Sequence, residues 1–249
     1  MTTGGARIGA HRRPVLGIAL AAGMIAGACA SAVPSAPSVP APPTPLPRQA
    51  GCTAARSASE HLCIVILGDS IAQGVPVVGD DRWWPRLRAL LQAALPGRTI
   101  EIDDWAVSGS KIDVLESAAR DQPDVGTFDL AIVIEGVNDE VSLPVDAWRP
   151  RYEAAVANLE AKGLIVVVTT PPPAFVDGAF GTRYDGFAAA IRQVAGGKRP
   201  LLDIAARWRV DGPTLAATYY VDAVHQALPG QILMATMARD VVLEAIGVH

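Results

Sequence analysis

The chain has 249 residues, half of them hydrophobic, and this length suits one globular domain better than two. Its net charge of -4 is unevenly distributed: Arg7, Arg12 and Arg13 precede residue 29 with no acidic residue among them, and removing these three positive charges leaves -7. A mildly acidic domain without a basic stripe has no electrostatic footprint for nucleic acid, so we exclude DNA and RNA as partners.

The first 30 residues have the pattern of an export signal. Arginines precede the apolar run VLGIALAAGMIAGACA, which is short for a membrane span and ends in small residues. Two cleavage chemistries fit this end. ACA before Ser31 is an A-x-A site of ordinary secretion, whereas AGAC resembles a bacterial lipobox in which Cys29 becomes the lipidated first residue. We therefore expect a protein exported from a bacterial cell, either secreted or attached to the membrane through Cys29.

Residues 31–51 form a proline-rich linker, with seven prolines between residues 31 and 50. Such a segment builds no packed core and favours an extended polyproline conformation, which would span about 60 Å at roughly 3.1 Å per residue. A stalk of this kind suits a protein with one fixed end and so favours the lipid anchor, while a spacer on a freely secreted enzyme is the alternative. The folded domain is expected at residues 52–249.

The three cysteines bear on the same question, because exported proteins tend not to leave a thiol unpaired. If Cys29 carries a lipid or leaves with the signal, Cys52 and Cys63 remain as an even pair. We expect a disulfide between them that ties the first ordered residues of the domain to its first strand. Two separately buried thiols are the alternative.

From residue 63 onward, strand patterns alternate with helical patterns. Short apolar runs that are rich in β-branched residues and bounded by Gly, Pro or Asp are typical of buried parallel strands. They occur at 63–67, 99–103, 130–136, 164–170 and 200–204. Helical signals cover 83–95, 145–163 and about 229–246. The alternation predicts an α/β fold, a three-layer α/β/α sandwich around a flavodoxin-like doubly wound sheet of about five parallel strands.

The first predicted strand ends in Gly68, Asp69 and Ser70, residue types that are common in turns and helix caps. Alternatively, this turn holds the Ser70 hydroxyl at the carboxyl end of a parallel sheet, where open α/β folds carry their chemistry. A nucleophilic serine needs a general base, and of the four histidines only His225 lies well inside the predicted domain. It follows Asp222 by three residues, a spacing at which a carboxylate can orient the imidazole.

Two further segments offer hydrogen-bond donors for an oxyanion hole. Gly109 in AVSGS follows the second predicted strand and allows a close approach of the backbone, and Asn138 in EGVND follows the third and carries a side-chain amide. Each also has a structural interpretation, as a turn glycine or as a helix cap. Because both are predicted at the same end of the sheet as Ser70, we interpret the set as a site for acyl transfer.

Four blocks, GDS, AVSGS, GVND and DAVH, occur in the same order as in the SGNH hydrolase superfamily, the GDSL-type esterases and lipases, and the chain resembles that superfamily from residue 63 to residue 246. The resemblance implies that Ser70 is the nucleophile, that His225 is its base and that Asp222 orients His225. It also implies an oxyanion hole made of the N–H groups of Ser70 and Gly109 and the side chain of Asn138.

The sequence thus predicts an exported serine esterase that hydrolyses carboxylic esters through an acyl-enzyme on Ser70. One alternative is an acetyl or acyl esterase, or an acyltransferase, that acts on a cell-envelope glycan. Another is a catalytically idle envelope-binding protein, which the loss of a site residue would favour. No metal or organic cofactor is implied, the substrate is a small-molecule or glycan ester, and the oligomeric state is left open. Phe175, Phe180 and Tyr184 are expected to line the cleft, where aromatic side chains suit acyl chains and sugars alike.

Overall fold

The computed structural model describes residues 60–248, so the predicted export signal and linker, with Cys29 and Cys52, lie outside the described residues. Five strands form one sheet in the order β2-β1-β3-β4-β7, and every pairing is parallel. The strands are β1 (His61–Gly68), β2 (Thr99–Asp104), β3 (Leu130–Ile134), β4 (Ile165–Thr169) and β7 (Leu201–Leu202). The predicted five-stranded parallel sheet is confirmed, with the doubly wound order: the chain adds β2 on one side of β1 and then β3, β4 and β7 on the other.

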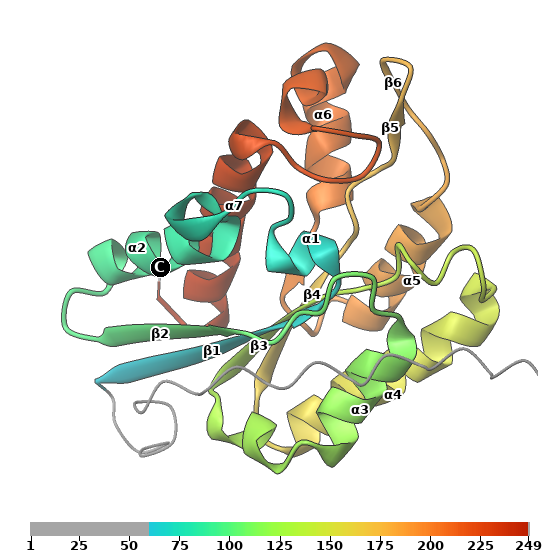
Figure 1. Cartoon of the computed structure of the whole chain (residues 1–249). Helices are drawn as coiled ribbons and strands as arrows, with labels where there is room; N and C mark the ends of the chain where they lie inside the picture. Colours follow the sequence, from blue (N-terminus) through green and yellow to red (C-terminus); the bar gives the residue numbers. More distant parts are fainter. Residues whose placement is uncertain (1–59, 249) are drawn as a thin grey trace, which may run out of the picture. The chain divides into compact units, whose positions relative to one another are not determined.

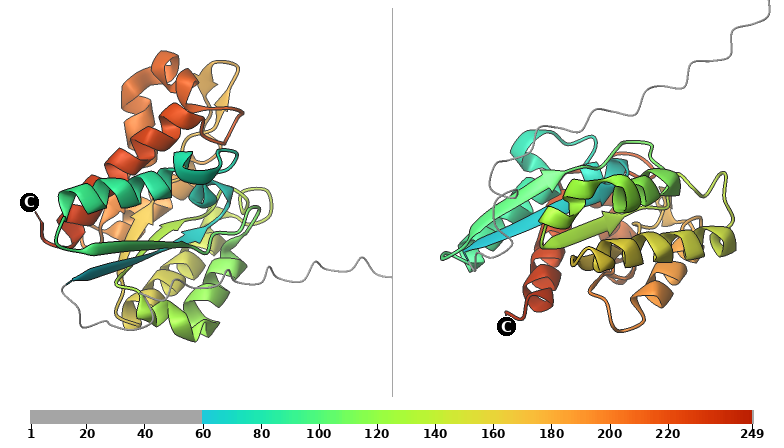
Figure 2. Two further views of the ribbon diagram at one scale, coloured as in Figure 1. Left: turned by 60° about the vertical axis from the view of Figure 1, so that its left-hand side comes forward. Right: turned by 90° about the horizontal axis from the view of Figure 1, so that it is seen from below.

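Helices cover both faces of this sheet (Figure 1; Figure 2). One face carries α2 (Trp83–Ala94), α6 (Ile204–Ala216) and α7 (Leu228–Ala245). The opposite face carries α3 (Ile112–Asp121), α4 (Val145–Ala161) and α5 (Asp185–Ala195). The predicted three-layer sandwich is confirmed. Within residues 60–248, no helix has the length and apolar character needed to cross a membrane.

Strand β1 contributes to both hydrophobic cores, because successive side chains of a strand point to opposite faces of the sheet. Ile64 and Ile66 pack with residues of α2 and α7, whereas Val65 and Leu67 pack with residues of α3 and α4. All four are 2% exposed or less. Burial on both faces is the physical reason why this strand has an unbroken apolar run and not an alternating pattern.

The smaller elements differ most from the expectation. The last strand is only two residues long, because Asp203 caps α6 and accepts a hydrogen bond from the N–H of Ala206 at 3.1 Å. Helices α3, α5 and α6 were not among the predicted helical segments. The remaining short elements are α1 (Ser70–Gln73), η1 (Gly79–Asp81), η2 (Pro123–Thr127), η3 (Ala217–Tyr219), β5 (Phe175–Val176) and β6 (Ala179–Phe180).

The carboxyl ends of β1, β2 and β3 meet at one edge of the sheet. Gly68 pairs with Ile134, and the N–H of Asp69 donates to the Ile134 carbonyl at 3.2 Å. The N–H of Val107, in the loop after β2, donates to the Gly68 carbonyl at 2.8 Å. Glycine is required at position 68, since its φ is +134° and a Cβ there would lie 1.7 Å from the Ile134 carbonyl oxygen. This close approach brings together the loops that follow β1, β2 and β3.

Candidate active site

Ser70 is the first residue of the short helix α1, directly after β1. The preceding residue, Asp69, caps this helix, and its carboxylate accepts a hydrogen bond from the N–H of Ile71 at 2.8 Å. Ser70 is 5% exposed. The turn therefore does both things that the sequence left open: it caps a helix, and it holds the serine hydroxyl at the carboxyl end of the sheet.

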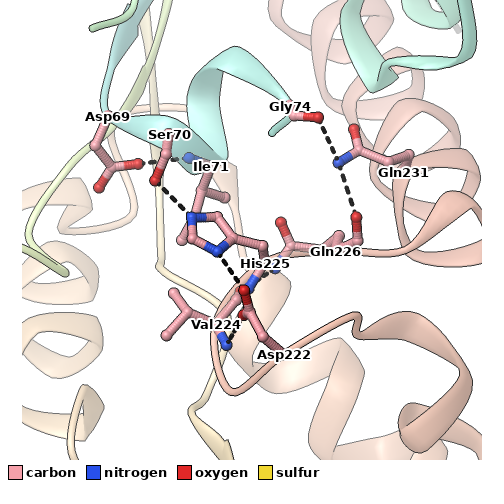
Figure 3. A network of polar contacts seen from close by, with 9 residues as sticks. All are labelled: Asp69, Ser70, Ile71, Gly74, Asp222, Val224, His225, Gln226 and Gln231. Atoms are coloured by element: carbon pink, nitrogen blue, oxygen red, sulfur yellow. Dashed lines mark hydrogen bonds and ion pairs between the residues drawn. The ribbon is translucent and has the colours of Figure 1, made fainter. Parts of the chain in front are cut away.

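His225 lies in the loop between η3 and α7, beside Ser70 (Figure 3). Its Nε2 is 2.9 Å from the Ser70 Oγ, and its Nδ1 is 2.8 Å from an Asp222 carboxylate oxygen. The other oxygen of Asp222 accepts the N–H groups of Val224 and His225 at 2.8 and 2.7 Å. A carboxylate beside Nδ1 favours the tautomer in which Nδ1 carries the hydrogen, which leaves Nε2 free to accept the serine proton.

The electrostatics of Asp222 suit this arrangement. Burial alone would raise the pKa of its carboxyl, but hydrogen bonds from the backbone and imidazole of His225 and from the N–H of Val224 hold the pKa below its ordinary value. Asp222 is therefore ionised at neutral pH. Its negative charge would stabilise an imidazolium at His225.

Gln231, in the first turn of α7, connects the segments that carry the serine and the histidine (Figure 3). It is fully buried. Its side-chain nitrogen donates to the carbonyl of Gly74, at the end of α1, at 3.3 Å and to the carbonyl of Gln226 at 3.4 Å. Its side-chain oxygen accepts the N–H of Trp83 at 2.9 Å. One amide thus ties α1 to the loop that holds the base.

A cavity of about 240 Å³ opens beside the serine and the histidine. Its walls are formed by Ser70, Ser108, Gly109, Val137, Asn138, Tyr184, Val224 and His225. Both expected oxyanion donors besides Ser70 are therefore in this wall, while Asp222 lies behind the imidazole. Of the three aromatic residues expected at the cleft, only Tyr184 lines this cavity. Phe175 packs instead against Phe180 and Tyr220, so the expectation is corrected for Phe175 and Phe180.

The side chain of Asn138 is held in place from one side. Its Nδ2 donates to the Ser110 carbonyl at 3.0 Å, and because a primary amide carries two N–H groups, one remains for a ligand in the cavity. Helix α4 begins at Val145 with Pro144 at its N-cap, so Asn138 does not cap it. Gly109 also lines the cavity. Its φ of +80° is a backbone conformation that favours glycine.

Asn138→Ala is expected to lower kcat by about 10²- to 10³-fold while KM moves little, because an oxyanion donor acts mainly in the transition state. The purified variant and the parent are compared by steady-state kinetics and by thermal unfolding. Asn158→Ala, an exposed asparagine in α4, is the matched control. Activity per folded molecule within a few-fold of the parent would leave the oxyanion hole to backbone N–H groups alone.

Two acidic residues near the site are buried. Asp69 is fully buried, and burial raises its pKa to about 7, although hydrogen bonds from Ile71 and Ala72 act in the opposite direction. Asp139 is also buried; it accepts the N–H of Ile112 at the start of α3 and the indole N–H of Trp148 in α4. Asp139 thus anchors both helices behind the site. Within residues 60–248, no group of three or more His, Cys, Asp or Glu side chains is arranged to hold a metal ion.

The expected disulfide involves a residue on each side of the described boundary. Cys63 lies in β1, is 4% exposed and has no disulfide partner among residues 60–248, while Cys52 lies outside the described residues. The Cys52–Cys63 bond therefore stays a prediction, as does lipidation of Cys29.

Comparison with known proteins agrees with this geometry. The model of the GDSL-like Lipase/Acylhydrolase family matches residues 66–231. No curated protein matches the chain. Among solved structures, the lipase/acylhydrolase from Enterococcus faecalis is similar, with a TM-score of 0.59, 18% identity, and coverage of 72% of this chain and 94% of that one.

Two esterases of known structure are similar to the same extent. The acetyl xylan esterase AlAXEase has a TM-score of 0.57 and 21% identity, covering 73% of this chain and 100% of that one. A variant of Axe2, an acetyl-xylooligosaccharide esterase from Geobacillus, has a TM-score of 0.60 and 20% identity, covering 77% and 96%. At these identities the similarity concerns the fold.

Proposed function

The chain belongs to the GDSL-like lipase/acylhydrolase family of serine esterases, and from that premise we propose that it is an exported esterase that cleaves carboxylic esters through an acyl-enzyme on Ser70. The observation that carries the proposal is the hydrogen-bonded chain from Ser70 through His225 to Asp222, at 2.9 and 2.8 Å. Such a complete chain has no use in a catalytically idle binding protein, so we do not favour that alternative.

The proposed reaction has two halves, acylation of Ser70 and hydrolysis of the acyl-enzyme, and the same groups act in both. His225 takes the hydroxyl proton as the Ser70 oxygen attacks the ester carbonyl, and the N–H groups of Ser70 and Gly109 and the amide of Asn138 stabilise the negative oxygen. His225 then gives its proton to the departing alcohol. In the second half, His225 takes a proton from the water that attacks the acyl-enzyme carbonyl and returns it to the Ser70 oxygen as the bond between that oxygen and the acyl carbon breaks, and the carboxylic acid leaves.

A short acyl group, with acetyl as the best example, is the substrate part that the cavity favours. Its volume of about 240 Å³ falls below the roughly 300 to 1,000 Å³ that is usual for sites that enclose drug-sized ligands. The alcohol part would then lie outside this volume. Two similar structures are esterases of acetylated xylan or xylooligosaccharide, which supports an acetylated glycan as the second candidate substrate.

We expect kcat/KM to be highest for the acetyl ester in a series of p-nitrophenyl acetate, butyrate and octanoate, and to fall by tenfold or more (about 1.4 kcal/mol or greater) for the octanoate. Tyr184→Leu, which shortens a wall of the cavity, should shift the preference toward butyrate, whereas Tyr184→Phe, which keeps the ring, should not. A parent enzyme that prefers octanoate would contradict the short-acyl proposal.

An acetylated oligosaccharide distinguishes an esterase, which transfers the acetyl group to water, from an acyltransferase, which transfers it to a sugar hydroxyl. Release of acetate with a higher kcat/KM than on p-nitrophenyl acetate supports a glycan esterase, and appearance of acetyl groups on an added free oligosaccharide supports an acyltransferase.

Export and a lipid anchor at Cys29 are also part of our proposal. Fractionation of the producing cells tests the anchor, since Cys29→Ser should release the protein from membranes if the anchor exists.

A further inference from the structure

Glu135 is a buried acid that the proposed mechanism does not use. It follows β3 directly, one residue before the loop that carries Asn138, and it is 1% exposed. Its two carboxyl oxygens are hydrogen-bonded to uncharged groups, the N–H of Gly136 at 3.2 Å and the hydroxyl of Ser110 at 3.1 Å. Glutamate is rarely buried without an oppositely charged partner, so its place here calls for a physical reason.

Ser110 links this acid to the other two loops of the site. Its hydroxyl is 2.9 Å from the carbonyl of Gly68, which ends β1 two residues before Ser70. Its own carbonyl accepts the side chain of Asn138 at 3.0 Å, and its neighbour in the chain is Gly109. Glu135 and Ser110 thus join the loops after β1, β2 and β3, and each of these loops supplies one proposed oxyanion donor.

The hydrogens of this network fit best when Glu135 is uncharged. The Ser110 hydroxyl has a single hydrogen, and the Gly68 carbonyl can only accept. If the hydroxyl donates to Gly68, the carboxyl of Glu135 must donate to Ser110, which requires that it be protonated. The surroundings agree: burial first, and then the charges of Asp69 and Asp139, raise the pKa of Glu135 well above its ordinary value.

The groups that face Glu135 come from every neighbouring element. They are Asp69 after β1, Ser110 after β2, Asp139 in its own loop and Tyr152 from α4; burial first, and then the charge of Glu135, raise the pKa of Tyr152. None of these four brings a positive charge. An ionised Glu135 would place a negative charge behind the groups that must stabilise an oxyanion, and a neutral one avoids this.

We propose that Glu135 is a positioning residue that, acting through Ser110, fixes the three donor-bearing loops of the oxyanion hole relative to one another. The inference rests on the proposed function, because it assumes that Ser70, Gly109 and Asn138 act on one oxygen. In this role Glu135 touches no substrate. Its loss would let the loops shift relative to one another, and a misplacement of about 1 Å can cost on the order of 10²-fold in rate.

The test compares Glu135→Gln and Glu135→Ala in the purified protein. Glutamine keeps the shape, and like a neutral acid it can donate to the Ser110 hydroxyl and accept from the N–H of Gly136, so its kcat should stay within about threefold of the parent. Alanine removes the link, so its kcat should fall by about 10- to 100-fold with KM within about threefold. Val133→Ala, in β3 two residues before Glu135 and outside the network, should lower the thermal midpoint and leave kcat per folded molecule unchanged, and so serves as the control.

Either of two results overturns the inference. One is a Glu135→Ala enzyme with parental kcat; the other is a Glu135→Gln enzyme as impaired as Glu135→Ala, which would mean that no neutral donor suffices. If Glu135→Ala does not fold, Ser110→Ala cuts the same link and must show the same selective loss of kcat. Failure of the proposed function is seen separately, as turnover that survives Ser70→Ala.

Discussion

Ser70→Ala is expected to lower kcat by about 10⁶-fold, or roughly 8 kcal/mol of transition-state stabilisation, as in other serine triads that lose their nucleophile. The hydroxyl is hydrogen-bonded to the His225 imidazole at 2.9 Å, so its removal leaves the base without a proton to take. The helix cap is made by Asp69 and is unaffected, so the fold should persist. Kinetics with p-nitrophenyl acetate, together with the thermal midpoint, measure both effects.

The matched control is Ser108→Ala, because Ser108 carries a hydroxyl in the wall of the same cavity. Its kcat should stay within a few-fold of the parent. A Ser108→Ala enzyme without activity beside an active Ser70→Ala enzyme would mean that the nucleophile is the other serine.

His225→Ala should cost about as much as the loss of Ser70, on the order of 10⁶-fold in kcat, because an alcohol is a weak nucleophile without its general base. Asp222→Ala should cost less, about 10⁴-fold, since the carboxylate orients the imidazole and does not transfer the proton. The 2.8 Å contact between the Asp222 carboxylate and Nδ1 is the geometric basis of this order.

His61→Ala is the control for the histidine, because His61 lies at the start of β1, at the opposite end of that strand from Ser70. We expect its kcat per folded molecule to equal that of the parent. A fully active His225→Ala enzyme would refute the triad. Equal losses of kcat at His225 and Asp222 would only raise the part of the rate enhancement that is assigned to the Asp222 carboxylate.

The central sheet could be predicted because each central strand is buried on both faces and therefore appears as a continuous apolar run. The run at 130–136 became β3 and the run at 164–170 became β4, with shorter ends. Prediction failed where local signals are interrupted. Helix α6 contains Gly212 with a non-helical conformation and Pro213 after it, and β7 is reduced to two residues by the cap of the next helix.

The positions of the site residues could be predicted for a related reason. Ser70, Gly109 and Asn138 each follow a strand, so the topology alone brings them to one edge. Glu135 and Gln231 could not be found in this way, because their partners are distant in sequence: Gln231 donates to Gly74, 157 residues away. An acid immediately after a fully buried strand was the only local sign of Glu135.

The most direct test of the proposed nucleophile is covalent trapping followed by peptide mass spectrometry. An organophosphonate ester mimics the ester carbonyl and leaves its phosphonyl group on the attacking oxygen, so the parent should gain one adduct, on the peptide that contains Ser70. Ser70→Ala should gain none, and Asn138→Ala should react more slowly at the same site because one oxyanion donor is missing. An adduct on another residue, or undiminished labelling of Ser70→Ala, would contradict the account.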